Sequence, residues 1–231
     1  MPSPVKVSLP SIADLLGADE KFLVAVLPEK VDLAGWNSDS PVFDRLVEET
    51  SPATIIQVGA WKGRSTAHLA AASAGRTELD TVSGAAIPAP SKIYDVDTWL
   101  GGIDHVLSSL PQDDLQRDAF GSPRLYHQYL RNFRDHVSAH RIFPIQNTSV
   151  NGARLLRAAG LTAQLIYIDA SHEYADVYAD LCAYFPLLVP GGVMFGDDFR
   201  SFPGVFAAVV RFAHEQNLSL KEEENNFWIL R

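Results

Sequence analysis

Two short apolar runs of this sequence end in carboxylates. The run Leu165–Ile168 leads into Asp169, with His172 three residues later, and the run Val193–Gly196 leads into Asp197 and Asp198. Apolar runs of this length, bounded by turn residues, are typical of strands that are buried on both faces. Ligands of open α/β sheets bind beyond the carboxyl ends of the strands, so both acidic ends are expected at the edge where chemistry takes place.

The three acids would share a small space if the two strands were neighbours, because paired backbones lie about 5 Å apart. Ionised carboxylates in such a space repel one another unless a proton or a cation joins them, and a hard divalent cation prefers oxygen ligands. We therefore predict a metal site at Asp169, Asp197 and Asp198, with His172 beside it. Each acid could instead cap the following helix, and the Asp197-Asp198 pair could be a solvated turn.

A second candidate site follows the β-branched run 54–58, which continues into Gly59-Ala-Trp-Lys-Gly63 and then a helical pattern to Ser73. A strand, a glycine turn and a helix in this order are typical of nucleotide binding, and Ser65 or Thr66 could satisfy the free N–H groups at the helix start. The spacing is Gly-x-x-x-Gly, not Gly-x-Gly-x-x-Gly, which favours a nucleoside-like cofactor without a diphosphate. An ordinary βα turn is the alternative.

Asp97 ends the next predicted strand, residues 92–97, where such sites place a carboxylate for ribose hydroxyls. Trp99 follows and could either cover the adenine or belong to the core. Beyond a third strand, residues 141–146, Thr148 or Ser149 could face a base or cap the next helix, and capping is favoured. Pro144 indicates that this third strand lies at a sheet edge.

The remaining elements alternate in the manner of an α/β sheet with helices on both faces. We expect helices over 40–49, 122–136, 174–188 and 204–216, a loop over 74–92, and a closing hairpin formed by 218–222 and 227–230. Residues 1–50 read as an N-terminal extension, with the 40–49 helix across one sheet edge and a short helix at 11–16. Residues 51–231 read as one domain in which the insertion 101–121 forms a lid above the same edge of the sheet.

Composition narrows the classes of function. The chain has 231 residues, 47% of them hydrophobic, and a formal net charge of -9. That charge, without a basic stripe, disfavours nucleic acid, and no run approaches the roughly 18 apolar residues of a membrane helix. No secretory signal is visible and Cys182 is the single cysteine, so we expect a cytoplasmic protein, with Cys182 in the core.

The order of elements resembles the seven-stranded, Rossmann-like class I S-adenosylmethionine-dependent methyltransferase fold, mostly parallel with a C-terminal antiparallel hairpin. The resemblance spans 51–231 and includes the glycine turn, Asp97 and the turn at Pro190-Gly191-Gly192, although Gln57 replaces the usual acid. Ile168–Tyr174 with Gly196-Asp197-Asp198 is similar to the metal-dependent macrocin and mycinamicin sugar O-methyltransferases and to cephalosporin hydroxylase-like proteins. That likeness implies magnesium at Asp169, Asp197 and Asp198, and His172 as general base.

The resemblance leads us to expect an S-adenosylmethionine-dependent, Mg²⁺-dependent O-methyltransferase that acts on a small hydroxylated acceptor, such as a sugar or polyol, and that could form a homo-oligomer. We assign catalysis to His172 and Asp169. The residues expected to contact the cofactor are Gly59, Ala60, Trp61, Gly63, Ser65, Asp97, Thr98, Trp99, Ser149 and Asp169. The rivals are a non-methylating hydroxylase component or binding protein on the same fold, and an NAD-dependent oxidoreductase, which the glycine spacing disfavours.

Overall fold

The computed structural model describes residues 27–81, 84–107, 115–138 and 141–231, so the predicted helix at 11–16 lies outside the described residues. The main sheet has seven strands in the order β5-β4-β1-β6-β7-β9-β8. The first five of these strands run parallel, and β9 and β8 close the sheet as an antiparallel hairpin. Their bounds are β1 Thr54–Val58, β4 Lys92–Asp97, β5 Ile142–Gln146, β6 Ala163–Ile168, β7 Leu188–Gly196, β8 Leu220–Glu223 and β9 Asn226–Leu230. The predicted fold class is therefore confirmed.

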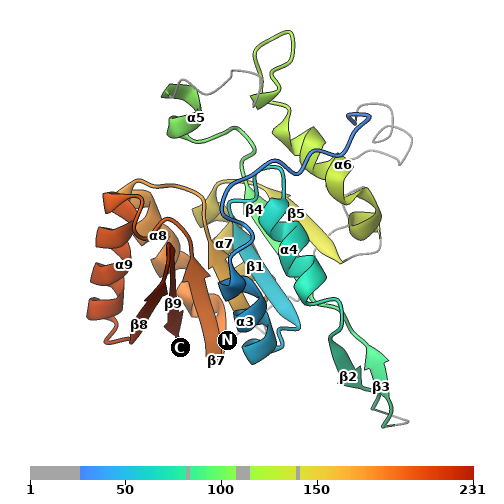
Figure 1. The fold of residues 1–231 in the computed structure, drawn as a ribbon, viewed down its shortest axis with the longest axis vertical. Helices are drawn as coiled ribbons and strands as arrows, with labels where there is room; N and C mark the ends of the chain where they lie inside the picture. The colour runs from blue at the N-terminus through green and yellow to red at the C-terminus, as the bar shows by residue number, and fades with distance from the viewer. Residues whose placement is uncertain (1–26, 82–83, 108–114, 139–140) are drawn as a thin grey trace.

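Helices cover both faces of this sheet (Figure 1). On one face, α3 (Pro41–Thr50), α4 (Arg64–Ala72) and α6 (Leu125–Ser138) bury apolar side chains with the strands. On the other face, α7 (Ser149–Ala158), α8 (Tyr174–Tyr184) and α9 (Pro203–Glu215) do the same. Each face of the sheet is thus packed against its own apolar layer of helices. This packing fixes the positions of the strand ends.

Helix α3 lies on a face of the sheet and not across its edge as predicted. The Phe43 ring meets the rings of Tyr167 in β6 and Phe195 in β7 at centroid distances of 4.9 and 5.1 Å. The predicted start of α3 is confirmed, since the Ser40 side chain accepts a hydrogen bond from the Val42 amide and Pro41 opens the helix. The apolar side of this amphipathic helix is therefore buried against the sheet.

Three local predictions are corrected. The predicted loop 74–92 contains a small hairpin, β2 (Thr77–Leu79) with β3 (Ala86–Pro88), that projects away from the body (Figure 1). Helix α6 begins at Leu125, and not at residue 122 as predicted. Cys182 is exposed, because it lies on the outer side of α8. The edge position of β5, which carries Pro144, is confirmed.

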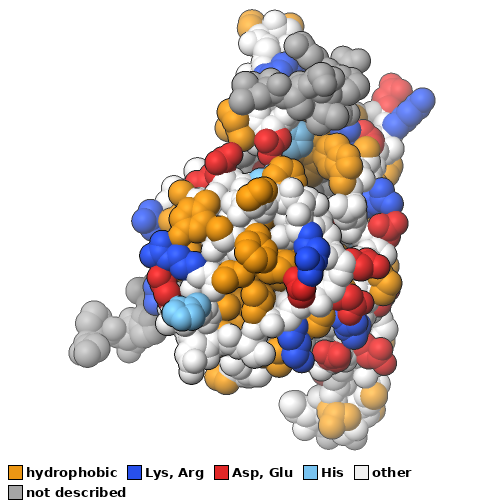
Figure 2. All heavy atoms as spheres, turned by 60° about the vertical axis from the view of Figure 1, so that its left-hand side comes forward, with side chains coloured by type: hydrophobic (Ala, Val, Ile, Leu, Met, Phe, Trp, Pro, Cys, Tyr) orange, Lys and Arg blue, Asp and Glu red, His pale blue; other side chains and the backbone are white. Residues whose placement is uncertain are grey.

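The surface mixes charges of both signs on the side that carries α9. In the view that brings α9 forward, acidic and basic side chains are interspersed and apolar side chains gather over the middle (Figure 2). Phe206 and Val210 of α9 are among the exposed large apolar residues. Among the described residues, none of the helices has the length and apolar character that crossing a bilayer requires.

Candidate functional site

A cavity of about 830 Å³ opens at the carboxyl ends of the parallel strands. Its wall combines the turn after β1, the end of β4, the start of α7 and the segments after β6 and β7. Residues 35–38 and 101–105, which lie outside the core sheet, complete the wall. The lining residues that were predicted to bind a cofactor or a metal are Gly59, Ala60, Trp61, Ser65, Asp97, Thr98, Ser149, Asp169, His172, Asp197 and Asp198. The sequence-predicted residues therefore converge on one cavity, apart from Gly63 and Trp99.

The turn Gly59–Gly63, called the glycine turn below, needs both of its glycines. Gly59 has φ +87°, and a Cβ there would lie 1.9 Å from the carbonyl oxygen of Asp169. Gly63 has φ +92°, and a Cβ there would lie 2.1 Å from the Phe133 ring. Any side chain at either position would strain the backbone and push the turn away from its neighbours. Gly63 therefore supports the cavity from behind, without lining it.

Asp97 fixes the glycine turn through backbone hydrogen bonds. Its Oδ2 accepts from the amides of Ala60 and Trp61 at 2.8 and 2.9 Å, and its Oδ1 accepts from the Trp99 amide at 2.7 Å. A carboxylate has about four lone-pair sites, so capacity remains for a ligand hydroxyl. The ribose role predicted for Asp97 stays a prediction, and the structure adds a role in shaping the turn.

Two predictions near this turn are corrected. Helix α4 starts without a side-chain cap, and Ser65 and Thr66 lie within the helix, so neither caps it. Ser65 instead accepts a hydrogen bond from the buried Gln57 side chain at 2.8 Å. Trp99 belongs to the core: its indole is 1% exposed, donates to the Trp61 carbonyl at 2.8 Å and packs against Tyr129, so it does not face the cavity.

The start of α7 confirms the favoured capping interpretation. The Thr148 side chain accepts a hydrogen bond from the Asn151 amide and caps the helix. Ser149 is half-buried and lines the cavity. Its carbonyl accepts a hydrogen bond from the Tyr184 hydroxyl at 2.7 Å, which ties the start of α7 to α8.

The acids after β6 and β7 emerge side by side because Ile168 is paired with Gly196 in the parallel register. Asp169, His172 and Asp198, called the acid group below, each offer a ligand atom, and these atoms lie within 4.8 Å of one another. Asp197 lies outside this group: it is 5% exposed and faces Asn226 at 3.4 Å. The structure therefore groups His172, and not Asp197, with Asp169 and Asp198.

Crowding changes the proton affinity of these acids. Burial, reinforced by the charge of Asp198, raises the pKa of Asp169 to about 6, although the Tyr167 hydroxyl donates to it at 2.9 Å. Burial and the charge of Asp169 raise the pKa of Asp197 to about 7. Carboxylates with raised pKa values gain from a nearby positive charge, so the acid group favours a cation.

His172 currently supplies that positive charge. Its Nε2 lies 2.9 Å from Asp198 and its Nδ1 lies 2.7 Å from Asp104, while its ring stacks on Phe202 at 3.8 Å. Burial lowers the pKa of His172, but the hydrogen bonds to Asp198 and Asp104 outweigh it and raise that pKa to about 9. In this arrangement the imidazole is protonated at neutral pH, so it must be freed from Asp198 before it can act as a base.

Asp104 lies on α5 (Ile103–Leu107), within the insertion that was predicted to form a lid. The next residue, His105, stacks on Trp61 of the glycine turn at 4.2 Å, and Trp36 tilts against both rings at 5.9 Å. These three residues, called the aromatic wall below, all line the cavity. Sequence reasoning missed Trp36, His105 and Asp104 because they come from segments without a motif.

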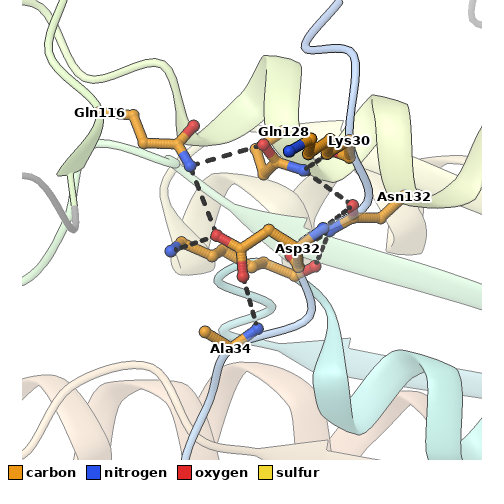
Figure 3. A network of polar contacts seen from close by, with 7 residues as sticks. Lys30, Asp32, Ala34, Gln116, Gln128 and Asn132 are labelled. Atoms are coloured by element: carbon orange, nitrogen blue, oxygen red, sulfur yellow. Dashed lines mark hydrogen bonds and ion pairs between the residues drawn. The ribbon is translucent and has the colours of Figure 1, made fainter.

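The N-terminal segment reaches the cavity because residues 29–34 are held by polar contacts, shown in Figure 3. Lys62 of the glycine turn pairs with Asp32 at 2.8 Å, and its side chain is almost completely buried. Asn132 of α6 accepts from the Asp32 amide at 3.0 Å and donates to the carbonyls of Asp32 and Lys62. Gln128 donates to the Lys30 carbonyl at 3.0 Å. These contacts fix the segment that presents Trp36 to the cavity.

Comparisons with known proteins agree with this geometry. A family described as "Methyltransferase domain" matches residues 56–199, which span the glycine turn and the acid group. A search of curated proteins gave no match.

Solved structures of three proteins share the fold. CalS11, a calicheamicin methyltransferase, is 18% identical with a TM-score of 0.58, covering 82% of this chain and 77% of that one. A second structure of CalS11 describes it as a TDP-rhamnose 3'-O-methyltransferase. The O-methyltransferase NovP is 15% identical (TM-score 0.53, coverage 82% and 78%). An O-methyltransferase from Bacillus cereus in complex with SAH is 13% identical (TM-score 0.54, coverage 95% and 95%).

Proposed function

Since this chain belongs to the methyltransferase-domain family, we propose that it transfers the methyl group of S-adenosylmethionine to a hydroxyl of a small, sugar-like or polyol-like molecule, with a divalent cation such as Mg²⁺ at the acid group. The observation that carries this proposal is the convergence of two sites on one cavity. The glycine turn held by Asp97 and the acid group of Asp169, His172 and Asp198 line the same cavity.

The cavity fits the cofactor. Its volume of about 830 Å³ lies within the usual range of about 300–1,000 Å³ for ligand sites. Gly59 lines the cavity without a side chain, and Asp97 retains acceptor capacity for a ribose hydroxyl. The solved O-methyltransferase from Bacillus cereus holds SAH, the product of this cofactor, on the same fold.

The acid group fits a divalent cation. Two carboxylates and an imidazole converge within 4.8 Å, and oxygen ligands suit Mg²⁺. Asp169 and Asp198 would hold the ion, and Asp197 would complete the protein ligands, which leaves His172 free to act as the base. A bound divalent cation would lower the pKa of a coordinated acceptor hydroxyl and fix its direction.

The proposed reaction forms one O–C bond and breaks one C–S bond. The acceptor oxygen attacks the methyl carbon, the sulfonium becomes a thioether, and the hydroxyl proton passes to Nε2 of His172. This step requires the deprotonated imidazole, so the Nε2–Asp198 contact must open while the Nδ1–Asp104 contact keeps the ring oriented. Alignment of the three reacting atoms by the glycine turn and the acid group supplies several kcal/mol of the barrier reduction.

The chemistry of the cavity wall supports a sugar-like acceptor. A sugar presents adjacent hydroxyls to the acid group and an apolar ring face to the aromatic wall, where Trp36 is 55% exposed. CalS11, which shares the fold, is described as a methyltransferase for a deoxysugar nucleotide. We therefore favour a sugar-like acceptor over an acceptor without vicinal hydroxyls.

Radiolabelled S-adenosylmethionine tests the proposal directly. The protein is incubated with a panel of glycosides and polyols, with Mg²⁺ or with a chelator, and label transfer is measured beside calorimetric titration with S-adenosylhomocysteine. We expect nucleoside binding and Mg²⁺-dependent label transfer. Nucleoside binding without transfer to any acceptor would favour the non-methylating alternative, and an absence of nucleoside binding would refute the proposal.

A further inference from the structure

The small hairpin formed by β2 and β3 stands away from the body of the molecule and takes no part in the proposed reaction. It follows α4 and precedes β4, so it lies at the amino ends of the parallel strands, opposite the cavity (Figure 1). All residues of its two strands are exposed, with Leu79 at 72% and Ile87 at 39%. An isolated two-stranded hairpin is marginally stable in water, whereas further strands stabilise it. The hairpin therefore lacks the packing that a pair of strands needs.

The base of this hairpin is nevertheless held firmly. The Arg76 carbonyl accepts a hydrogen bond from the Ala89 amide at 2.9 Å. The Arg76 guanidinium donates to the carbonyls of Ala89 and Ser51 at 2.7 and 3.3 Å. These bonds fix the direction in which the hairpin leaves the body, so its strands are presented to other molecules in a defined orientation.

The two outer edges of the hairpin differ in their ability to pair. Opposed residues of an antiparallel ladder alternate between pairs that exchange hydrogen bonds and pairs that do not. The Ala89 amide donates to the Arg76 carbonyl, and Thr77 and Pro88 form the next pair, so the backbone groups of Thr77 and Leu79 point away from β3. On the opposite edge Pro88 has no N–H to offer. The edge of β2 is therefore the one that is open to a further strand.

We propose that a second copy of this chain pairs with the edge of β2, antiparallel and about a two-fold axis at Glu78, to give a four-stranded sheet that joins two molecules. A strand that pairs with its own copy forms an isologous interface, which closes as a dimer. In this register Thr77 lies opposite Leu79 of the second copy, and their outward backbone groups exchange hydrogen bonds. Arg76 lies opposite Asp80 of the second copy, so opposite charges face each other across the axis.

The side chains of this edge suit self-pairing. On one face, Leu79 packs against Thr77 of the second copy and covers apolar surface that is exposed in the single molecule. On the other face the two Glu78 carboxylates meet at the axis, and the Arg76 guanidinium, which lies 3.7 Å from Glu78 within each copy, offsets their repulsion. The cavity lies at the other end of the sheet, so both copies keep it open. This inference does not rest on the proposed function.

Sedimentation equilibrium of the wild-type protein measures the association. The interface is small, so we expect a reversible dimer with a dissociation constant in the micromolar range. Thr77→Pro removes an outward N–H from the edge of β2 and no hydrogen bond between β2 and β3, so the dissociation constant should rise at least tenfold. Ala86→Pro is the matched control, because Ala86 faces Leu79 and its N–H points outward from the edge of β3. This variant should dimerise as the wild-type protein does.

Disulfide formation tests the register. Residues that face each other without exchanging hydrogen bonds have Cα atoms about 4.5 Å apart, within the range of about 4.4–6.8 Å that a disulfide spans. Cys182→Ser first removes the exposed native thiol. In that background, Glu78→Cys should give a covalent dimer under mild oxidation. Ile87→Cys is the control, since Ile87 lies opposite Glu78 within the hairpin, in the outer strand of the joined sheet, and should give no cross-link.

The remaining outcomes overturn the inference. A wild-type protein that stays monomeric up to its solubility limit has no such interface. Dimers that persist in Thr77→Pro, or that are lost equally in Ala86→Pro, use another surface. Equal cross-linking of Glu78→Cys and Ile87→Cys shows random collision, and no cross-linking of Glu78→Cys contradicts the two-fold axis. If Thr77→Pro does not fold, the two cysteine variants decide, because both positions are exposed.

Discussion

The two ends of the cavity hold their carboxylates in different ways. At the β4 end, Asp97 receives three backbone amides, from Ala60, Trp61 and Trp99. At the β6 and β7 ends, the carboxylates depend largely on side chains: Tyr167 donates to Asp169, and His172 bridges Asp198 and Asp104. Backbone donors are fixed by the fold, whereas side-chain donors can be exchanged for a ligand. The comparison indicates that the first end is preorganised and that the second is completed by what binds there.

The strongest test of this contrast is Asp97→Ala. Three amides lose a charged acceptor at once, so the glycine turn loses its shape. We expect the free energy of unfolding to fall by about 3–5 kcal/mol and the affinity for S-adenosylhomocysteine to fall more than a hundredfold. Chemical denaturation and calorimetry measure the two effects. A variant with wild-type affinity would show that the turn does not depend on Asp97.

A second test compares Asp97 with Asp95, which lies two residues earlier on the same side of β4. Asp95 is completely buried and receives the Tyr129 hydroxyl, but its Oδ1 has no protein partner among the described residues. Burial raises its pKa to about 7. The folded state therefore holds this proton more tightly than the unfolded state, and stability falls as the pH rises from about 4 to about 7.

Asp95→Asn removes this titration. We expect the part of the pH dependence due to Asp95, roughly 2–4 kcal/mol between pH 4 and pH 8, to disappear, with the variant relatively more stable at high pH. Urea denaturation at several pH values measures it. A pH profile identical to that of the wild-type protein would mean that Asp95 is not the buried proton binder.

A third test addresses the exchangeable end. Asp198→Asn removes one charged ligand from the acid group, so we expect the affinity for Mg²⁺ or Mn²⁺ to fall at least tenfold. The affinity for S-adenosylhomocysteine should stay within about twofold, because the nucleoside is held at the other end. Glu173→Gln is the control, since it removes an exposed charge from the cavity rim without touching the acid group. Equal cation affinity in both variants would contradict the cation site.

The smallest expected effect concerns the N-terminal segment that presents Trp36 to the cavity. Asp32→Asn removes the partner of the buried Lys62 ammonium, although the Asp32 side chain is 35% exposed and water can partly replace it. We expect a loss of about 1–2 kcal/mol in the free energy of unfolding and a modest loss of nucleoside affinity. The double variant Asp32→Asn/Lys62→Met measures the coupling. Purely additive losses would show that the pair does not interact.

The sequence predicted what local patterns encode. The apolar runs, the glycine turn and the carboxylates at strand ends each occupy a short stretch, so the sheet and most of its site residues could be found without the structure. The roles of Asp104, Trp36 and Lys62 could not, because they depend on partners far along the chain: His172 is 68 residues from Asp104, and Asp32 is 30 residues from Lys62. Asp97 was found as an acid, but its backbone partners depend on how the turn closes. The metal ligands also stay a prediction, because the structure groups His172, and not the predicted Asp197, with Asp169 and Asp198.

The contact between the Asp32 amide and Asn132 spans one hundred positions of the chain. During synthesis on the ribosome, the segment that carries Trp36 emerges early, yet its anchor on α6 is made only after β1, α4 and β4 have been translated. The nascent protein therefore has an unfinished cavity wall until α6 has emerged, and a shortened polypeptide that ends before α6 would leave the glycine turn without its outer support.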